Sequence, residues 1–283
     1  PNHCYLDPRQ GAIGCFEEAC RNVICTGANP IGMVDHLQFG NPEDPEVFWT
    51  FMESIEGLAD FAKFLRIPCV GGKVSFYNET KLGPIKPTPL IGVLGIIDNF
   101  PLTTTPPNHG DYLIIIGKTK DELGGSEYYE YIHKFIGGIC PIVNFKDSKI
   151  NMLTVLSLIK NRLVKSVHDC SKGGAAIAIS ELSIFGNIGC DIDIEKLTDK
   201  DDFSIDKLLF SESHSRYLLV IDKKNIKQVR QFLSKKKSTF AILGKFSGDR
   251  IQLKHKSKYL VKLGVDIAQK KYFNTLEGLL KNG

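Results

Sequence analysis

One short stretch, His168-Asp169-Cys170-Ser171-Lys172-Gly173-Gly174, combines an acid, a hydroxyl and a glycine pair before an apolar run. That run, over 175–182, is typical of a helix, so the stretch is predicted to lie at a helix N-terminus. Unpaired backbone N–H groups and the positive end of the helix dipole favour bound phosphate there. An aspartate beside phosphate oxygens can also hold Mg²⁺, which prefers carboxylate ligands. The alternative interpretation is an Asp or Ser cap with glycines that allow close packing.

Two more oxygen-bearing side chains are spaced as a pair of ligands. A helix is predicted over 11–26, where Glu18 and Asn22 lie four residues apart and therefore share one face. This face points away from apolar Phe16 and Cys20. The functional interpretation is that both oxygens bind one ion, and the structural alternative is a solvated polar face.

A second group of candidate residues lies on predicted strands. A strand over 30–36 is expected to end in Asp35, and a strand over 67–77 is interrupted by Gly71-Gly72. Paired glycines inside a strand indicate a bulge or the close approach of another group to the backbone. Asn41-Pro42 is predicted to begin the helix between these strands. Its apolar face, including its aromatic residues, is expected in the core and comprises Phe48, Phe51, Met52, Ile55, Leu58, Ala59, Ala62 and Leu65.

The order of elements predicts two α/β domains, over 1–100 and 108–283. A further strand over 90–97 closes the first domain, and the prolines and threonines of 98–110 mark the boundary. In the second domain, a helix is predicted to start at Gly124-Gly125-Ser126. The other elements expected there are strands over 111–116, 163–167, 188–194, 216–221 and 239–246, helices over 151–163 and 223–235, and a final amphipathic helix.

Composition excludes several classes of protein. The 283 residues are 42% hydrophobic and 24% charged, with a net charge of +4, which is ordinary for a globular protein. No aromatic-studded basic stripe indicates nucleic-acid binding, and no apolar run approaches the roughly 18 residues of a membrane span. The eight cysteines form no C-x-x-C pair, which argues against a zinc or redox motif and favours a reducing compartment. Because the chain begins at Pro1 without Met, it is expected to be a piece of something longer.

Six segments in chain order resemble one family, the synthetase subunit of phosphoribosylformylglycinamidine synthase, within the aminoimidazole ribonucleotide synthetase-like superfamily. The segments are 7–12 with 18–23, Asp35-His36-Leu37-Gln38-Phe39-Gly40-Asn41-Pro42, Gly71-Gly72-Lys73-Val74-Ser75-Phe76-Tyr77-Asn78-Glu79-Thr80, Lys120-Asp121-Glu122-Leu123-Gly124-Gly125-Ser126, His168–Gly174 and, more weakly, Glu212-Ser213-His214-Ser215-Arg216. A lone H-D-x-S-x-G-G motif would be weak, but the ordered set covers nearly the whole chain.

The resemblance implies an α+β fold of two tandem halves, of which this chain is similar to the C-terminal half. Its first domain would be ferredoxin-like, without its opening strand, and would pair with an equivalent domain into a β-barrel. The implied activity is an ATP-dependent carbon–nitrogen ligation of purine biosynthesis, in which formylglycinamide ribonucleotide becomes its amidine. The amide oxygen is phosphorylated, and ammonia then displaces the phosphate. The implied partners are the N-terminal half, a glutaminase subunit that supplies ammonia and a small bridging subunit, in the cytoplasm; without the N-terminal half, a dimer through the barrel-forming sheet is expected.

The resemblance also assigns roles to residues of this chain. Asp35 and Gly72 match positions that bind ATP, and Ser75 matches a contact to the substrate. Positions that hold Mg²⁺ around an auxiliary nucleotide in long single-chain members match Glu18, Asn22 and Asp169, and a contact to that nucleotide matches Ser171. These oxygen ligands and glycines suit Mg²⁺ and phosphate chemically.

Two departures from the family pattern concern lysines. Lys73 stands where short-form enzymes carry a magnesium-binding Asn, so it is interpreted as a phosphate-neutralising point charge. Lys172 replaces an acidic residue common in the helix-opening motif, and the two interpretations are added positive charge beside phosphate and an altered pocket. The proposed catalytic histidine of the family belongs to the other half, so no catalytic residue is expected here and His168 is predicted to be structural. The alternatives are an intact relative of the aminoimidazole ribonucleotide synthetase type and a non-catalytic nucleotide-binding module.

Overall fold

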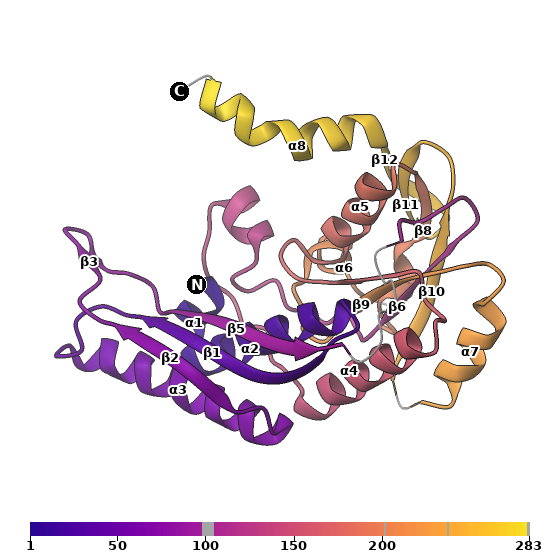
Figure 1. Ribbon diagram of the computed structural model, residues 1–283. Helices are drawn as coiled ribbons and strands as arrows, with labels where there is room; N and C mark the ends of the chain where they lie inside the picture. Colours follow the sequence, from indigo (N-terminus) through magenta and orange to yellow (C-terminus); the bar gives the residue numbers. More distant parts are fainter. Residues whose placement is uncertain (98–104, 201, 237, 282–283) are drawn as a thin grey trace.

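The first domain is a three-stranded sheet with two long helices on one face (Figure 1). The computed structural model describes residues 1–97, 105–200, 202–236 and 238–281. The helices are α1 (Asn2–Leu6), α2 (Pro8–Cys25) and α3 (Pro45–Leu65), and the strands are β1 (Asn29–Gln38), β2 (Cys69–Ser75), β3 (Glu79–Thr80), β4 (Gly83–Pro84) and β5 (Thr88–Ile96). In the order β2-β1-β5, β1 is parallel to β2 and antiparallel to β5, while β3 and β4 form a separate hairpin.

The two faces of this sheet differ in burial. Met33 and Leu37 of β1 pack with α2 and α3 in the core, together with Ile91 and Val93 of β5. The opposite face, here called the open face, carries the exposed apolar side chains of Val34, Leu90, Leu94 and Ile96. The three strands close no barrel within the described residues, so the barrel that the resemblance implies needs strands from elsewhere.

The second domain is built on a seven-stranded mixed sheet in the order β12-β11-β8-β10-β6-β9-β7. Its strands are β6 (Tyr112–Ile116), β7 (Ser166–Asp169), β8 (Cys190–Asp193), β9 (Tyr217–Ile221), β10 (Phe240–Phe246), β11 (Arg250–His255) and β12 (Lys258–Gly264). Its helices are a π-helix (Tyr128–Ile132), α4 (Phe145–Lys160), α5 (Gly174–Gly186), a 3₁₀ turn (Ile194–Leu197), α6 (Ile205–Phe210), α7 (Ile226–Ser234) and α8 (Val265–Lys281). Figure 1 shows α8 extending away from the seven-stranded sheet, past α5.

Several predicted elements need correction in the first domain. β1 continues to Gln38, so Asp35 lies inside the strand instead of at its end. α3 begins at Pro45 behind an Asp44 cap, because the Asp44 carboxylate accepts bonds from two backbone N–H groups of the first turn. Phe48 and Met52 are exposed, which corrects their placement in the core. β2 is continuous, and the irregularity lies in its register between Met33 and Val34 of β1.

In the second domain, the helix predicted to start at Gly124-Gly125-Ser126 is the π-helix, which follows a turn at 124–125, and α4 begins six residues before the predicted 151. The predicted boundary over 98–110 falls partly on 98–104, which lie outside the described residues. Its two sides belong to different sheets, since β5 ends at Ile96 and β6 begins at Tyr112.

Candidate functional site

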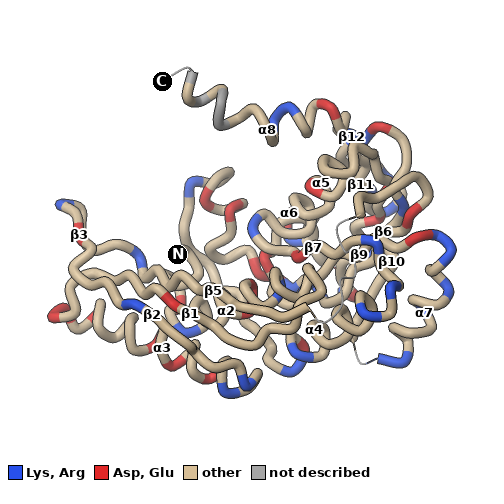
Figure 2. The backbone as a smooth tube through the Cα atoms, in the orientation of Figure 1, with Lys and Arg blue, Asp and Glu red and all other residues tan. Residues whose placement is uncertain are grey.

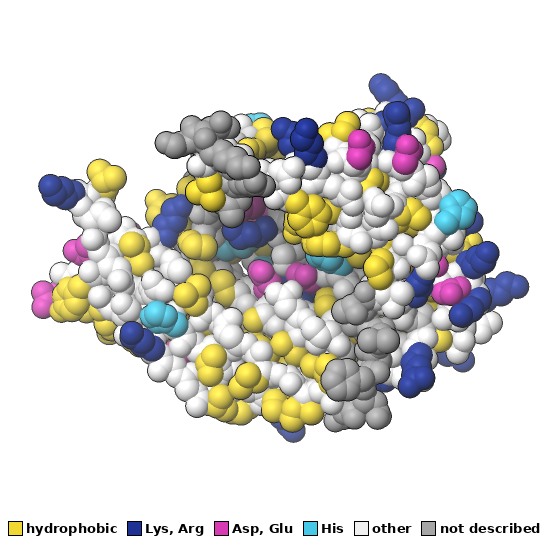
Figure 3. Space-filling model, turned by 45° about the horizontal axis from the view of Figure 1, so that its top comes forward, with side chains coloured by type: hydrophobic (Ala, Val, Ile, Leu, Met, Phe, Trp, Pro, Cys, Tyr) yellow, Lys and Arg dark blue, Asp and Glu magenta, His cyan; other side chains and the backbone are white. Residues whose placement is uncertain are grey.

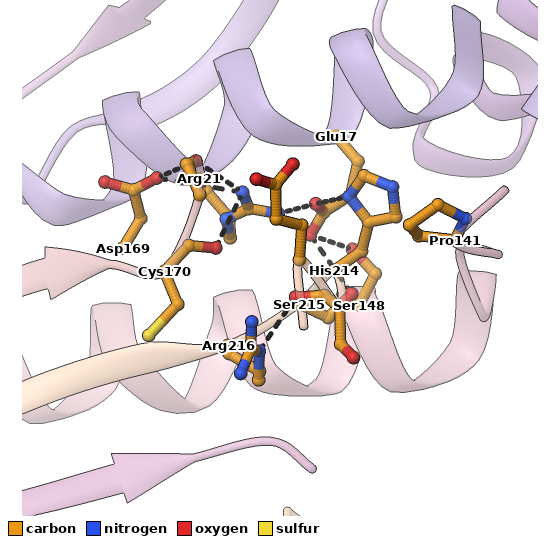
Figure 4. A network of polar contacts seen from close by, with 12 residues as sticks. Glu17, Arg21, Pro141, Ser148, Asp169, Cys170, His214, Ser215 and Arg216 are labelled. Carbon is orange, nitrogen blue, oxygen red and sulfur yellow. Dashed lines mark hydrogen bonds and ion pairs between the residues drawn. The ribbon is translucent and has the colours of Figure 1, made fainter. Parts of the chain in front are cut away.

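Helix α2 carries two charged residues into the junction between the domains. Asp7 caps this helix by accepting a bond from the backbone N–H of Gln10, and Pro8 occupies its first turn. Glu17 and Arg21 lie four residues apart on the helix, and their side chains are 0% and 1% exposed. Because α2 contacts both α4 and β7, this ion pair is enclosed by the second domain (Figure 4).

The Glu17 carboxylate is paired on every side. It accepts hydrogen bonds from Ser148 Oγ at 3.0 Å and Ser215 Oγ at 3.1 Å, and from Arg21 Nη1. His214 Nδ1 lies 3.6 Å from Glu17 Oε2. Burial by itself would raise the pKa of Glu17, but Arg21, His214 and Ser148 outweigh it and lower the pKa to about 2. This carboxylate is therefore a buried anion that holds the two domains together.

Arg21 reaches from Glu17 to the predicted phosphate loop. Its Nη2 atom donates to Ser171 Oγ at 2.9 Å and to the carbonyl oxygen of Cys170 at 3.3 Å, and lies 3.7 Å from Asp169 Oδ2. Ser171 Oγ donates in turn to Asp169 Oδ2 at 2.5 Å. Two predicted site residues, Asp169 and Ser171, are thus brought together, but around an arginine that the sequence analysis missed. A charged pair at i and i+4 inside an otherwise buried helix face was the signal that could have indicated it.

A cavity of about 360 Å³ lies beside this network. The cavity corresponds to a hollow between the domains where acidic and histidine side chains gather (Figure 3). It is lined by Pro1, Asn2, His3, Cys4, Cys15, Glu18, Arg21, Lys86, Gly125, Glu127, Glu130, Ser171, Lys172, Glu212 and His214. Glu18 is half-buried on this wall, whereas Asn22 is exposed and does not line the cavity. Among the described residues, no group of three His, Cys, Asp or Glu side chains is arranged to hold a metal ion.

Glu212 occupies the helix terminus that the sequence predicted for phosphate. Its Oε1 atom accepts bonds from the backbone N–H groups of Gly173 and Glu127, each at 2.9 Å. Gly173 is the N-cap of α5 and has a left-handed backbone, and no side chain caps this helix. Burial raises the pKa of Glu212 to about 7, against the lowering effect of the two backbone bonds. The Asp or Ser cap considered for this stretch is therefore absent.

The neighbouring His168 and Lys172 make contacts of a structural kind. His168 Nε2 lies 3.4 Å from Glu181 Oε2, and its Nδ1 lies 2.6 Å from the backbone oxygen of Asp169. Lys172 is exposed and donates to Glu127 Oε1 at 2.6 Å. Since Lys172 also lines the cavity, it places one positive charge on its rim.

The second predicted group lies on β1 and β2 but is divided between the faces of the sheet. Asp35 is opposite Gly72 in the register, and these two share the face of Leu37. Lys73 and Ser75 alternate with Gly72 and therefore lie on the open face.

Local contacts account for the glycine at position 72 and for the orientation of the Ser75 side chain. A Cβ at Gly72 would lie 2.3 Å from Asp35 Oδ1, so the glycine makes room for that carboxylate. Asn78 Nδ2 donates to Ser75 Oγ at 3.2 Å and to the backbone oxygen of Phe39, which fixes the serine side chain at the end of β2.

The fold and these two groups of residues define a class: a two-domain α+β protein with an open three-stranded sheet joined to a seven-stranded mixed sheet. Residues 1–97 match the model of the AIR synthase related protein N-terminal domain, and residues 108–256 match that of its C-terminal domain. The chain therefore belongs to the AIR synthase related family.

Curated relatives are more specific. The phosphoribosylformylglycinamidine synthase subunit PurL of Thermococcus sibiricus is 40% identical over 282 residues, which cover 99% of this chain and 39% of the relative. The PurL subunit of Methanocaldococcus jannaschii is 41% identical, with coverage of 98% and 38%. The chain thus spans about two fifths of the length of these relatives.

Solved structures share the fold. A structure of Thermotoga maritima PurL complexed with FGAR matches with a TM-score of 0.80 at 18% identity and covers 95% of this chain and 44% of that one. A second, of the same protein with ATP, has a TM-score of 0.76. The hydrogenase maturation protein HypE of E. coli matches at 0.65 and 15% identity, and here the chain covers 79% of that protein.

Proposed function

We propose that this chain acts as the C-terminal half of a phosphoribosylformylglycinamidine synthase synthetase subunit, and that it contributes nucleotide-binding and substrate-binding residues to the ATP-dependent ligation. The observation that carries the proposal is identity of about 40% to PurL subunits over 99% of the chain, across both domains. The similarity to HypE, at 15% identity, concerns the fold alone. It therefore gives weaker support to the alternative, an intact enzyme of the aminoimidazole ribonucleotide synthetase type, than the PurL identity gives to the proposal.

The sheet of the first domain supplies the groups that this function needs. Asp35 and the bare backbone of Gly72 would contact ATP, as expected from the family pattern. On the open face, Ser75 would hydrogen-bond the substrate, and Lys73 would neutralise phosphate oxygens as an exposed point charge. Phosphoryl transfer depends mostly on positioning and charge neutralisation, which fixed hydroxyl, backbone and ammonium groups provide.

The open face also indicates where the remaining half of the enzyme would bind. The apolar side chains Val34, Leu90, Leu94 and Ile96 lie on the same face as Lys73 and Ser75. We infer that the equivalent sheet of the N-terminal half covers this face and completes the barrel, so that the substrate site borders the junction. The glutaminase and bridging subunits and a cytoplasmic setting are proposed on the family pattern alone. None of the helices in the described part of the chain has the length and apolar character of a membrane span.

Two of the three predicted magnesium ligands lie beside a fixed positive charge or outside the cavity. Of the three predicted ligands, Asp169 is already bound by Ser171 and faces the Arg21 guanidinium, while Asn22 is exposed outside the cavity. Mg²⁺ demands a near-octahedral set of oxygen ligands, and a fixed positive charge 3.7 Å from the carboxylate opposes a second cation. The set Glu18, Asn22 and Asp169, as arranged, does not fit the ion.

Neighbouring glycines give a matched test of the proposed nucleotide site. Gly72→Ala would push the Asp35 carboxylate aside, whereas a methyl at Gly71 meets nothing nearer than Val34 Cγ1 at 3.9 Å. We expect Gly72→Ala to raise the KM for ATP roughly tenfold, the effect of losing about 1.4 kcal/mol of binding. Gly71→Ala should remain near the wild type.

The measurement is ATP-dependent amidine formation by this chain combined with the N-terminal half, with free ammonia as the nitrogen source. If the two substitutions changed the KM for ATP equally, Asp35 and Gly72 would not belong to the nucleotide site. No turnover by the combined wild-type halves, with both shown to be folded and associated, would contradict the ligase assignment itself.

A further inference from the structure

The Arg21 guanidinium occupies the position that a metal ion would take if Asp169 and Ser171 were its ligands. It donates to the Ser171 hydroxyl and lies within ion-pair distance of the Asp169 carboxylate. Its other end is paired with Glu17, which is itself fully buried and held by two serine hydroxyls. An arginine stays protonated at any physiological pH, so this positive charge is permanent.

The Glu212 carboxylate stands where a phosphate oxygen would bind. Two backbone N–H groups converge on its Oε1 atom, one at the start of α5 and one just before the π-helix. Such convergent N–H groups at helix starts are the donors that phosphates use. The side chain of Glu212 is 5% exposed and lies among the residues lining the cavity, so it fills this position from within the fold.

The two observations concern the same cavity and are independent of each other. We propose that this cavity is self-liganded: Arg21 takes the place of a divalent cation beside Asp169 and Ser171, and Glu212 takes the place of a phosphate at the start of α5. The cavity between α2 and the loop before α5 then binds no Mg²⁺·nucleotide, and ATP use by this chain rests on the sheet of the first domain. The inference relies on the proposed function only for the class of ligand that is replaced.

The first test asks whether Asp169 is an ion-pair partner of Arg21 or a metal ligand. Thermal unfolding of the chain and of Asp169→Asn is measured with EDTA and again with excess Mg²⁺. Because Arg21 and Ser171 lose the carboxylate in both buffers, we expect the same fall in Tm in each, roughly 2–4 °C. A fall seen only with Mg²⁺ would show that Asp169 is a metal ligand and would overturn the proposal, as would an unchanged Tm in both buffers.

The second test removes the internal cation. In Glu17→Gln/Arg21→Gln both buried charges are neutralised together, so that neither is left unpaired. Mn²⁺ binding, followed by the electron paramagnetic resonance signal of the free ion, should be at least about tenfold tighter than in the wild-type chain, the effect of about 1.4 kcal/mol. Adding Asp169→Asn should abolish that gain. Equal Mn²⁺ binding by the wild type and the double variant would contradict the proposal, and if the double variant does not fold, the first test decides.

Inorganic phosphate alone probes the other end of the cavity. Glu212→Ala frees the two backbone N–H groups, so phosphate should raise the Tm of this variant and leave that of the wild type unchanged. A wild-type response equal to that of the variant would overturn the assignment of Glu212, as would no response in a folded variant. None of these measurements uses ligase activity, so they fail or succeed independently of the proposed function.

Discussion

At the scale of single residues, Glu17 shows what a buried carboxylate requires of its surroundings. Removing an ion from water costs several kcal/mol, and this cost is offset only when charge and hydrogen bonds are supplied together. Here Arg21, Ser148 and Ser215 supply both, from three different segments of the chain. The carboxylate therefore contributes to stability only while all of them are in place.

Acid should remove this contribution. The pKa of Glu17 is lowered in the folded chain, from its ordinary 4.5 to about 2, so the stabilisation is present above about pH 4.5 and is lost as the pH falls toward 2. The shift corresponds to on the order of 3 kcal/mol. We expect the stability difference between the wild type and Glu17→Gln, measured by urea unfolding, to shrink steadily across this interval. A difference that stays constant down to pH 2 would contradict the ionised pair.

At the scale of elements, hydrophobic periodicity and strand patterns predicted most of the sheet strands and long helices. β6, β9 and β10, and the body of α2, lie within one to three residues of the sequence predictions. The errors concern ends and short elements. α3 begins at Asp44-Pro45 and not at Asn41-Pro42. Both dipeptides carry an N-terminal signal, but Asn41 accepts its bond from Glu43 within a turn, whereas Asp44 accepts bonds from the first turn of the helix.

Other features were beyond local patterns. The parallel pairing of β11 with β8 depends on contacts distant in sequence, whereas β11 and β12 form a local hairpin, with its turn at 256–257, that the sequence analysis missed. Prediction of the candidate site was limited in the same way. The loop motif indicated Asp169 and Ser171, but Arg21 lies 150 residues from Ser171 in the sequence. Only the packing of α2 on β7 brings them together.

The Asp44 cap allows a quantitative check at this scale. Asp44 Oδ1 accepts bonds from the backbone N–H groups of Glu46 at 2.8 Å and Val47 at 3.4 Å. Asp44→Ala should therefore cost about 1 kcal/mol in the free energy of unfolding. Glu43→Ala, at an exposed neighbouring position, is the matched control and should cost less than about 0.5 kcal/mol. Chemical denaturation of both variants measures this, and equal costs would argue against the cap.

At the scale of the whole molecule, the open face of the sheet in the first domain exposes apolar side chains. Charged residues of both signs are spread over both domains (Figure 2), yet this face of the sheet presents four apolar side chains to solvent. Exposed apolar groups arranged in this way are typical of an interface. We expect this face to pair with a second copy of the chain when the N-terminal half is absent.

A charge on the open face should prevent this association. Leu94 and Leu153 are both 54% exposed, but Leu153 lies on α4, away from the sheet. Leu94→Lys would bury an unpaired ammonium in the pairing and should weaken it at least about tenfold. Leu153→Lys should leave it unchanged. Sedimentation equilibrium compares the three chains, and a monomeric wild type at micromolar concentration would count against the interface.

The junction built by α2 has a consequence for how the chain unfolds. One of the two hydrophobic clusters contains Ile13 and Phe16 of α2 and Phe61 of α3 together with Val155 of α4 and Tyr217 of β9, so residues of the two family domains share this cluster, and the other cluster lies in the second domain. Cooperativity follows the core and not the family boundary. Heating should therefore give one calorimetric transition, and a fragment beginning at residue 108 should not fold by itself. Evolution would have to duplicate or exchange the two domains as one unit.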